Sequence, residues 1–78
     1  MAILYKKNIA TFEGVVSVEE AEDLLQWSQK NPKGRADFTK CTHIHAADLQ
    51  VLMAARMSIA AWPQDDNLKT WLKVALVS

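Results

Sequence analysis

The sequence predicts a small α/β domain with a mixed sheet and helices packed mainly on one side. Short segments typical of strands alternate with longer segments whose apolar residues recur at helical spacing. A turn joins the first two β segments, and each later β segment lies between two helical ones. With 78 residues, the chain is expected to form a single domain over residues 1–78 with one hydrophobic core.

The composition argues against several classes of protein. Nine Lys and Arg residues balance nine Asp and Glu residues, whereas a nucleic-acid binder needs clustered positive charge. No apolar run approaches the roughly 20 residues that span a bilayer. The charges of the first seven residues follow the apolar ones, the reverse of a signal peptide. The single cysteine fits a reducing compartment. We therefore expect a cytoplasmic protein that binds neither nucleic acid nor membrane.

The first two β segments run from Ile3 to Lys6 and from Ile9 to Glu13. The polar residues between them predict an antiparallel hairpin, and Gly14 closes the second segment.

The first helix is predicted to begin at Ser17 and to end near Lys30. Ser17 and Glu20 have the spacing of a capping box, in which each side chain bonds the backbone N–H of the other residue. The segment 31–34 contains Pro and Gly and stops the helix. The predicted buried face consists of residues at helical spacing, namely Ala21, Leu24, Leu25 and Ser28.

The second half of the chain predicts a strand, a loop, two helices and a short strand between those helices. The strand covers 35–39, and the polar loop covers 40–45 with the cysteine and both histidines. A helix, apolar over most of its circumference and so expected to be central, runs from Ala46 to Arg56 or Met57. A short strand at 59–62 ends at Pro63, and N-cap residues at 65–67 begin a short C-terminal helix.

The segment from Ile44 to Leu52, which reads Ile-His-Ala-Ala-Asp-Leu-Gln-Val-Leu, resembles the STAS domain. This domain is found in bacterial anti-sigma-factor antagonists and in the cytoplasmic tails of sulfate transporters. Its members typically read Ile-Asp-Ser-Ser-Gly-Leu-Gln-Val-Leu at this point, after a strand that ends in Asp, a hydrophobic and a polar residue. Asp37-Phe38-Thr39 matches that strand end, and Phe12-Glu13-Gly14 matches an earlier strand. The resemblance covers roughly residues 9 to 62.

The chain departs from the family where partner-switching members are phosphorylated. It has His45-Ala46-Ala47-Asp48 in place of Asp-Ser-Ser-Gly, so Ala46 replaces the phosphorylated serine and has no hydroxyl. The resemblance thus implies a non-catalytic protein-interaction module of bacterial signalling that serine phosphorylation cannot switch. The implied partner is a histidine-kinase-like anti-sigma factor or another signalling protein. The expected binding residues lie around the start of the second helix, namely His43, His45, Ala46, Ala47, Asp48 and Gln50.

Asp48 allows two interpretations. An acidic residue in the first turn of a helix complements the helix dipole by about 0.3–1 kcal/mol. Alternatively, its fixed negative charge meets the partner near the position where the family carries a phosphate.

Cys41, His43 and His45 support a rival hypothesis of a metal- or thiol-dependent protein. Alternate residues of an extended segment point the same way, so three zinc ligands fit this spacing. A Cys–His pair also suggests a nucleophile and a base. The simpler interpretation is that His45 caps the helix and Cys41 packs in the core. No enzyme activity and no cofactor are expected, and a homo-oligomeric scaffold is a third possibility.

The three tryptophans are interpreted by their positions. Packing is expected for Trp27 and Trp71, whereas Trp62 before Pro63 is left open as a partner anchor.

Overall fold

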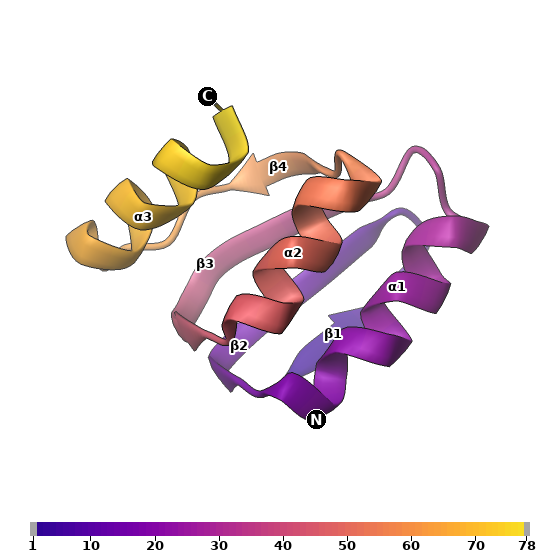
Figure 1. Ribbon diagram of the computed structural model, residues 1–78, viewed down its shortest axis with the longest axis horizontal. Coiled ribbons are helices and arrows are strands. Elements are labelled where there is room, and N and C mark those ends of the chain that lie inside the picture. Colours follow the sequence, from indigo (N-terminus) through magenta and orange to yellow (C-terminus); the bar gives the residue numbers. More distant parts are fainter. Residues whose placement is uncertain (1, 78) are drawn as a thin grey trace.

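The structure, a computed structural model, describes residues 2–77 and confirms the predicted α/β class (Figure 1). A four-stranded mixed sheet supports three α-helices within this part of the chain. None of these helices is long and apolar enough to cross a membrane. In chain order the elements are β1 (Ile3–Tyr5), β2 (Ile9–Val16), the 3-10 turn η1 (Val18–Glu20), α1 (Ala21–Lys30), β3 (Arg35–Ile44), α2 (Ala46–Ala55), β4 (Ser58–Ala61) and α3 (Asp66–Val77).

The strands lie in the order β1-β2-β3-β4. The predicted hairpin is confirmed, because β1 pairs antiparallel with β2 and the N–H of Lys6 donates to the carbonyl of Ile9 at 2.8 Å. β2, β3 and β4 are parallel, joined by crossovers through α1 and α2. Because α1 and α2 follow parallel strands, both begin at the edge of the sheet where β2 and β3 end (Figure 1).

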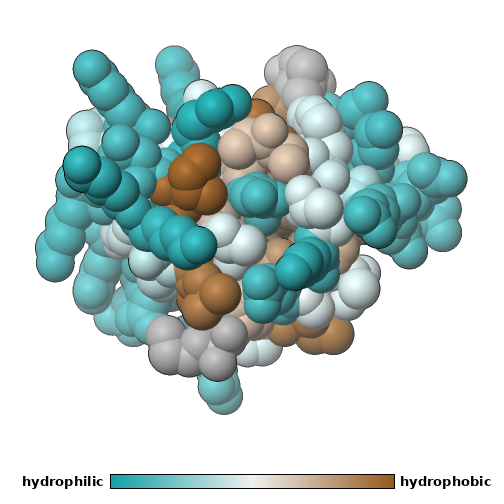
Figure 2. All heavy atoms as spheres, turned by 180° about the vertical axis from the view of Figure 1, so that it is seen from behind, coloured by the Kyte–Doolittle hydropathy of each residue, from teal (hydrophilic) through white to brown (hydrophobic). Residues whose placement is uncertain are grey.

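α2 lies between α1 and α3, as expected for a helix that is apolar over most of its circumference (Figure 1). α1 and α2 cover one face of the sheet, while α3 lies next to β4 (Figure 1). In Figure 1, no helix of residues 2–77 covers the opposite face of the sheet, and Figure 2 shows the molecule from that side. Side chains alternate between the two faces along each strand. A hollow of about 360 Å³ on the uncovered face is lined by alternate strand residues, including Leu4, Thr11 and Asp37.

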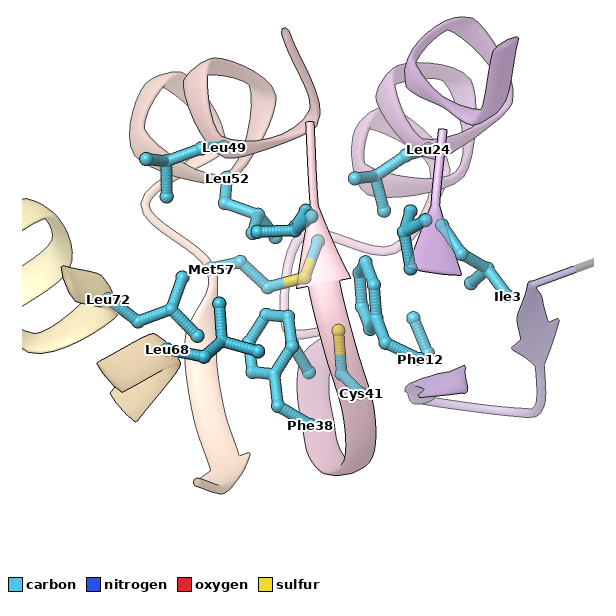
Figure 3. Packing of buried hydrophobic residues seen from close by; sticks show 14 residues of the cluster. Ile3, Phe12, Leu24, Phe38, Cys41, Leu49, Leu52, Met57, Leu68 and Leu72 are labelled. Atoms are coloured by element: carbon cyan, nitrogen blue, oxygen red, sulfur yellow. The ribbon is translucent and has the colours of Figure 1, made fainter. Parts of the chain in front are cut away.

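The core lies between the sheet and the helices (Figure 3). Its centre is the pair of Phe12 and Phe38, whose ring centroids are 4.5 Å apart. All of the largest core side chains come from strands or helices rather than loops, apart from Met57 after α2. Figure 3 shows the helix residues converging on these rings, among them Leu24, Leu49, Leu52, Leu68 and Leu72.

The start of the first helix differs from the prediction. Ser17 makes no side-chain capping bond, and the first turn is the 3-10 turn η1. Glu20 does not reach back to Ser17, because its carboxylate accepts the backbone N–H of Ala2 at 3.1 Å. The capping box is therefore replaced by a contact that ties the helix start to the N-terminal strand. The buried face of α1 is also narrower than predicted, since Leu25 is 39% exposed.

β3 is twice as long as the predicted strand, and the predicted loop at 40–45 is wrong. The strand continues to Ile44 because it stays paired with β2, with Gly14 opposite Cys41 and Val16 opposite Ile44. Two register shifts interrupt this pairing, and Gly14 beside the second one has a φ of +65° that glycine adopts without strain. These bulges disturb the alternation of polar and apolar residues, which is why the sequence resembled a loop.

Candidate functional site

Cys41 lies in the core and not in an exposed loop. Its side chain is 2% exposed, and its thiol donates to the carbonyl of His43 at 3.5 Å. Burial is the main cause that raises the pKa of the thiol to about 11, and the charge of Asp48 adds to it. The thiol is therefore protonated at neutral pH, the opposite of an activated nucleophile. Cys41 therefore packs in the core, as the simpler interpretation of its position expected.

His45 is the N-cap of α2. Its Nδ1 accepts the backbone N–H of Ala47 at 3.0 Å, and its carbonyl accepts the N–H groups of Asp48 and Leu49. The residue has an extended backbone, with φ −71° and ψ 147°, as N-cap residues typically do. This fixes the imidazole at the surface where β3 passes into α2.

The structure does not bring Cys41, His43 and His45 together as a ligand set. The second bulge of β3 puts an extra residue between the pairs Gly14–Cys41 and Val15–His43, so Cys41 faces the core while His43 is exposed. Among residues 2–77, no group of three or more His, Cys, Asp or Glu side chains could hold a metal. The segment is not a regular strand, so its alternate residues do not all point the same way. The spacing that suggested a zinc site therefore does not bring the three side chains together.

Asp48 is buried, contrary to the hypothesis that its charge meets a partner. Its exposed fraction is 0%, and neither carboxylate oxygen has a hydrogen-bond partner among the described residues. Burial is the main cause that raises its pKa to about 6, while the charge of His45 acts in the opposite direction. Asp48 thus lies inside the α1–α2 side of the domain and is not part of the surface.

The hydroxyl of Tyr5 belongs to the same buried region. It too has no hydrogen-bond partner among the described residues. Burial, followed by the charges of Glu20, Asp23 and Asp48, raises its pKa to about 12. Its ring lies 5.4 Å from that of Trp27. Among residues 2–77, Tyr5 and Asp48 are thus the two side chains with buried polar atoms that lack a hydrogen-bond partner, which is costly in a core of this size.

The other predicted binding residues lie at or near the surface. His43, His45, Ala46 and Gln50 are exposed, and Ala47 is half-buried. The exposed side of α2 continues beyond them to Met53 and Ala54. We call Ala46, Gln50, Met53 and Ala54 the α2 face. Sequence reasoning missed Met53 and Ala54, although their spacing from Ala46 and Gln50 places them on one side of a helix.

The α2 face contains no charge. The one charged residue within α2 is Asp48, which is buried. The neighbouring helices differ, since α1 exposes Glu22, Asp23 and Lys30, and α3 exposes Asp66 and Lys73. Met53 is 48% exposed, and a shallow hollow of about 380 Å³ lies along Gln50, Met53 and Ala54. This is the arrangement of a surface whose centre excludes charge, as in the core of a protein interface.

The tryptophans are placed differently from the prediction in one case. Trp27 packs against Tyr5 and Gly34, where an added Cβ would lie 2.6 Å from the indole. Trp62 is half-buried, and the Nζ of Lys73 lies 5.7 Å from its ring. The packing prediction for Trp71 is wrong, because this residue is 41% exposed. It borders a hollow of about 400 Å³ that His43 also lines.

No protein-family model matches this chain, and no curated protein matches it.

Proposed function

We propose that this domain is a non-catalytic protein–protein interaction module of bacterial regulation. The observation that carries the proposal is the absence of charge on the exposed face of the central helix. Long charged side chains normally cover exposed helix surface, and interface cores are depleted of them. In this domain α1 and α3 follow the usual pattern, whereas α2 does not.

The binding surface consists of the α2 face with His43 and His45 at its N-terminal end. The small side chains of Ala46 and Ala54 leave α2 accessible to a partner backbone, while Met53 offers a flexible apolar side chain that adapts to its neighbour. Gln50 and the two histidines supply polar groups that fix orientation. The N-cap bond of His45 holds one of these rings in place, which lowers the entropy lost on binding.

The resemblance to STAS domains supports the class of partner. It favours a histidine-kinase-like anti-sigma factor or another signalling protein, met in the cytoplasm. Ala46 has no hydroxyl to phosphorylate, and the buried Asp48 presents no fixed charge in its place. The module therefore binds constitutively, or under a control that does not act at this position.

A pair of identical substitutions on neighbouring helices tests the proposal. Gln50→Lys places a cation on the α2 face, and Gln29→Lys places one at an exposed position of α1. Proteins captured from a bacterial lysate by the wild-type domain are quantified for both variants, and the affinity of the purified partner is then measured. We expect capture to survive Gln29→Lys and to be lost with Gln50→Lys. Equal capture by both variants would contradict the proposal.

A further inference from the structure

Asp48 lies among groups that oppose the ionisation of its carboxyl group. Both carboxylate oxygens are buried, and neither has a hydrogen-bond partner among residues 2–77. The titratable groups coupled electrostatically to Asp48, or to the buried Tyr5 hydroxyl, come from several elements, namely Tyr5 of β1, Glu20 of η1, Asp23 of α1, Cys41 of β3 and His45 before α2. Burial opposes the charged form of Asp48 most, His45 attracts the charge from an exposed position, and Glu20 repels it. The closed structure therefore favours the protonated carboxyl group.

The 3-10 turn η1 packs against α2 and is weakly anchored there. None of its three residues is buried, and Ser17 before it makes no side-chain capping bond. Within η1 the N–H of Glu20 donates to the carbonyl of Ser17 at 3.2 Å. The Glu20 carboxylate also accepts the N–H of Ala2 at 3.1 Å. Because segments with few buried contacts open at a low cost in free energy, η1 can move without disturbing the core.

We propose that ionisation of Asp48 opens η1 away from α2, so that the start of the first helix responds to pH. A buried charge without a partner is costly, and opening lets water reach the carboxylate. It also separates Asp48 from the negative charge of Glu20. The rest of α1 stays in place, because it buries Leu24 and Ser28. This inference goes beyond the proposed function and does not depend on it.

The two protonation states of Asp48 determine how strongly the opening responds to pH. In the closed state the pKa of Asp48 is raised to about 6, whereas a hydrated carboxyl group has the ordinary value of 3.8. Below pH 3.8 the group is protonated in both states and does not favour opening. As the pH rises, the ionised form favours the open state. The ratio of open to closed molecules should therefore increase by up to about fiftyfold between pH 4 and pH 7.

Amide hydrogen exchange, followed by NMR from pH 4 to pH 7, tests this inference without a partner. The reporters are the N–H groups of Glu20 and Ala21, which donate to the carbonyls of Ser17 and Val18. Each exchange rate is divided by the rate of the same amide in an unstructured peptide, which removes the intrinsic effect of pH. In wild type this ratio should rise by up to about fiftyfold. It should stay constant in Asp48→Asn.

Two controls separate this opening from other causes of exchange. Asp66→Asn removes an exposed carboxylate from α3 and should behave like wild type. Low concentrations of urea should accelerate the amides of β3 but hardly those of η1, because opening η1 exposes little surface.

Glu20→Gln provides a second variant with the wild-type carboxyl group at Asp48. Gln keeps an acceptor for the N–H of Ala2 and removes the charge that repels Asp48, so the pH response of the Ala21 amide should shrink. An unchanged response in Glu20→Gln would overturn the inference. So would an equal response in wild type and Asp48→Asn, or exchange of the η1 amides in step with those of β3 as urea is added.

Discussion

Replacing Asp48 by Asn should stabilise the domain at neutral pH. The substitution keeps the size of the side chain and removes a charge that is fully buried without a hydrogen-bond partner among the described residues. The pKa of Asp48 is raised from 3.8 to about 6, so its ionised form is disfavoured in the folded state. At a pH above both values this difference corresponds to about 3 kcal/mol of lost stability. Asn has no charge to bury, so the domain does not lose this stability in the variant.

The direction of the pKa shift determines how the effect of Asp48→Asn on stability changes with pH. Because the folded pKa lies above the unfolded one, Asp48 costs no stability below pH 3.8, and its cost grows as the pH rises to about 6. The advantage of Asp48→Asn should therefore be small at pH 4 and larger by about 2 kcal/mol at pH 7. For a domain of this size, the gap between the thermal midpoints of Asp48→Asn and wild type should therefore be roughly 8–16 °C wider at pH 7 than at pH 4.

Urea unfolding followed by tryptophan fluorescence measures the free energy of unfolding of both proteins between pH 4 and pH 7. The matched control is Asp66→Asn, the same change at an exposed position in the first turn of α3. This control should lose up to about 1 kcal/mol, because it removes a charge that complements the helix dipole. A difference between wild type and Asp48→Asn that is constant across this pH range would refute the reasoning. So would a loss of stability at pH 7.

Three further outcomes follow from single contacts. His45→Ala should lower the free energy of unfolding by about 1 kcal/mol, because α2 loses its N-cap. His45→Asn should recover most of this free energy, since Asn is also a good N-cap residue. Equal free energies of unfolding for the two variants would count against the cap. Cys41 in the native protein should resist iodoacetamide at pH 8 and react after unfolding in urea, since burial raises the pKa of its thiol to about 11. Mass spectrometry follows the labelling. Rapid labelling of the native protein would show that the thiol is not buried. Gly34→Ala should lower the free energy of unfolding, measured in urea, by about 1–3 kcal/mol, because the new Cβ would lie 2.6 Å from the ring of Trp27. An unchanged urea midpoint would mean that the indole moves freely.

Much of the fold could be predicted because local signals agree with the final structure. The hairpin, the limits of α2, the short β4 and the N-cap of α3 all follow from turn residues, apolar spacing and caps. Asp65 illustrates this, since its carboxylate accepts the N–H of Leu68 at 2.9 Å. The long β3 could not be predicted, because its bulges change which side chains face the core, and bulges depend on pairing with a strand distant in the sequence.

The candidate site was only partly predictable for a related reason. Asp48 has the sequence context of an exposed residue that complements a helix dipole, and its burial depends on tertiary packing that the local sequence does not contain. In the same way, Trp71 follows the buried Leu68 by three residues in α3, a spacing that predicts packing, yet Trp71 is exposed.

The ratio of two dissociation constants tests most directly whether the uncharged α2 face is the binding surface. The purified partner that wild-type domain captures is titrated against Gln50→Lys and Gln29→Lys, two domains with the same net charge. We predict a dissociation constant at least about tenfold higher for Gln50→Lys, since a lysine would be desolvated at the centre of the interface. Two dissociation constants within experimental error of each other would contradict the central claim.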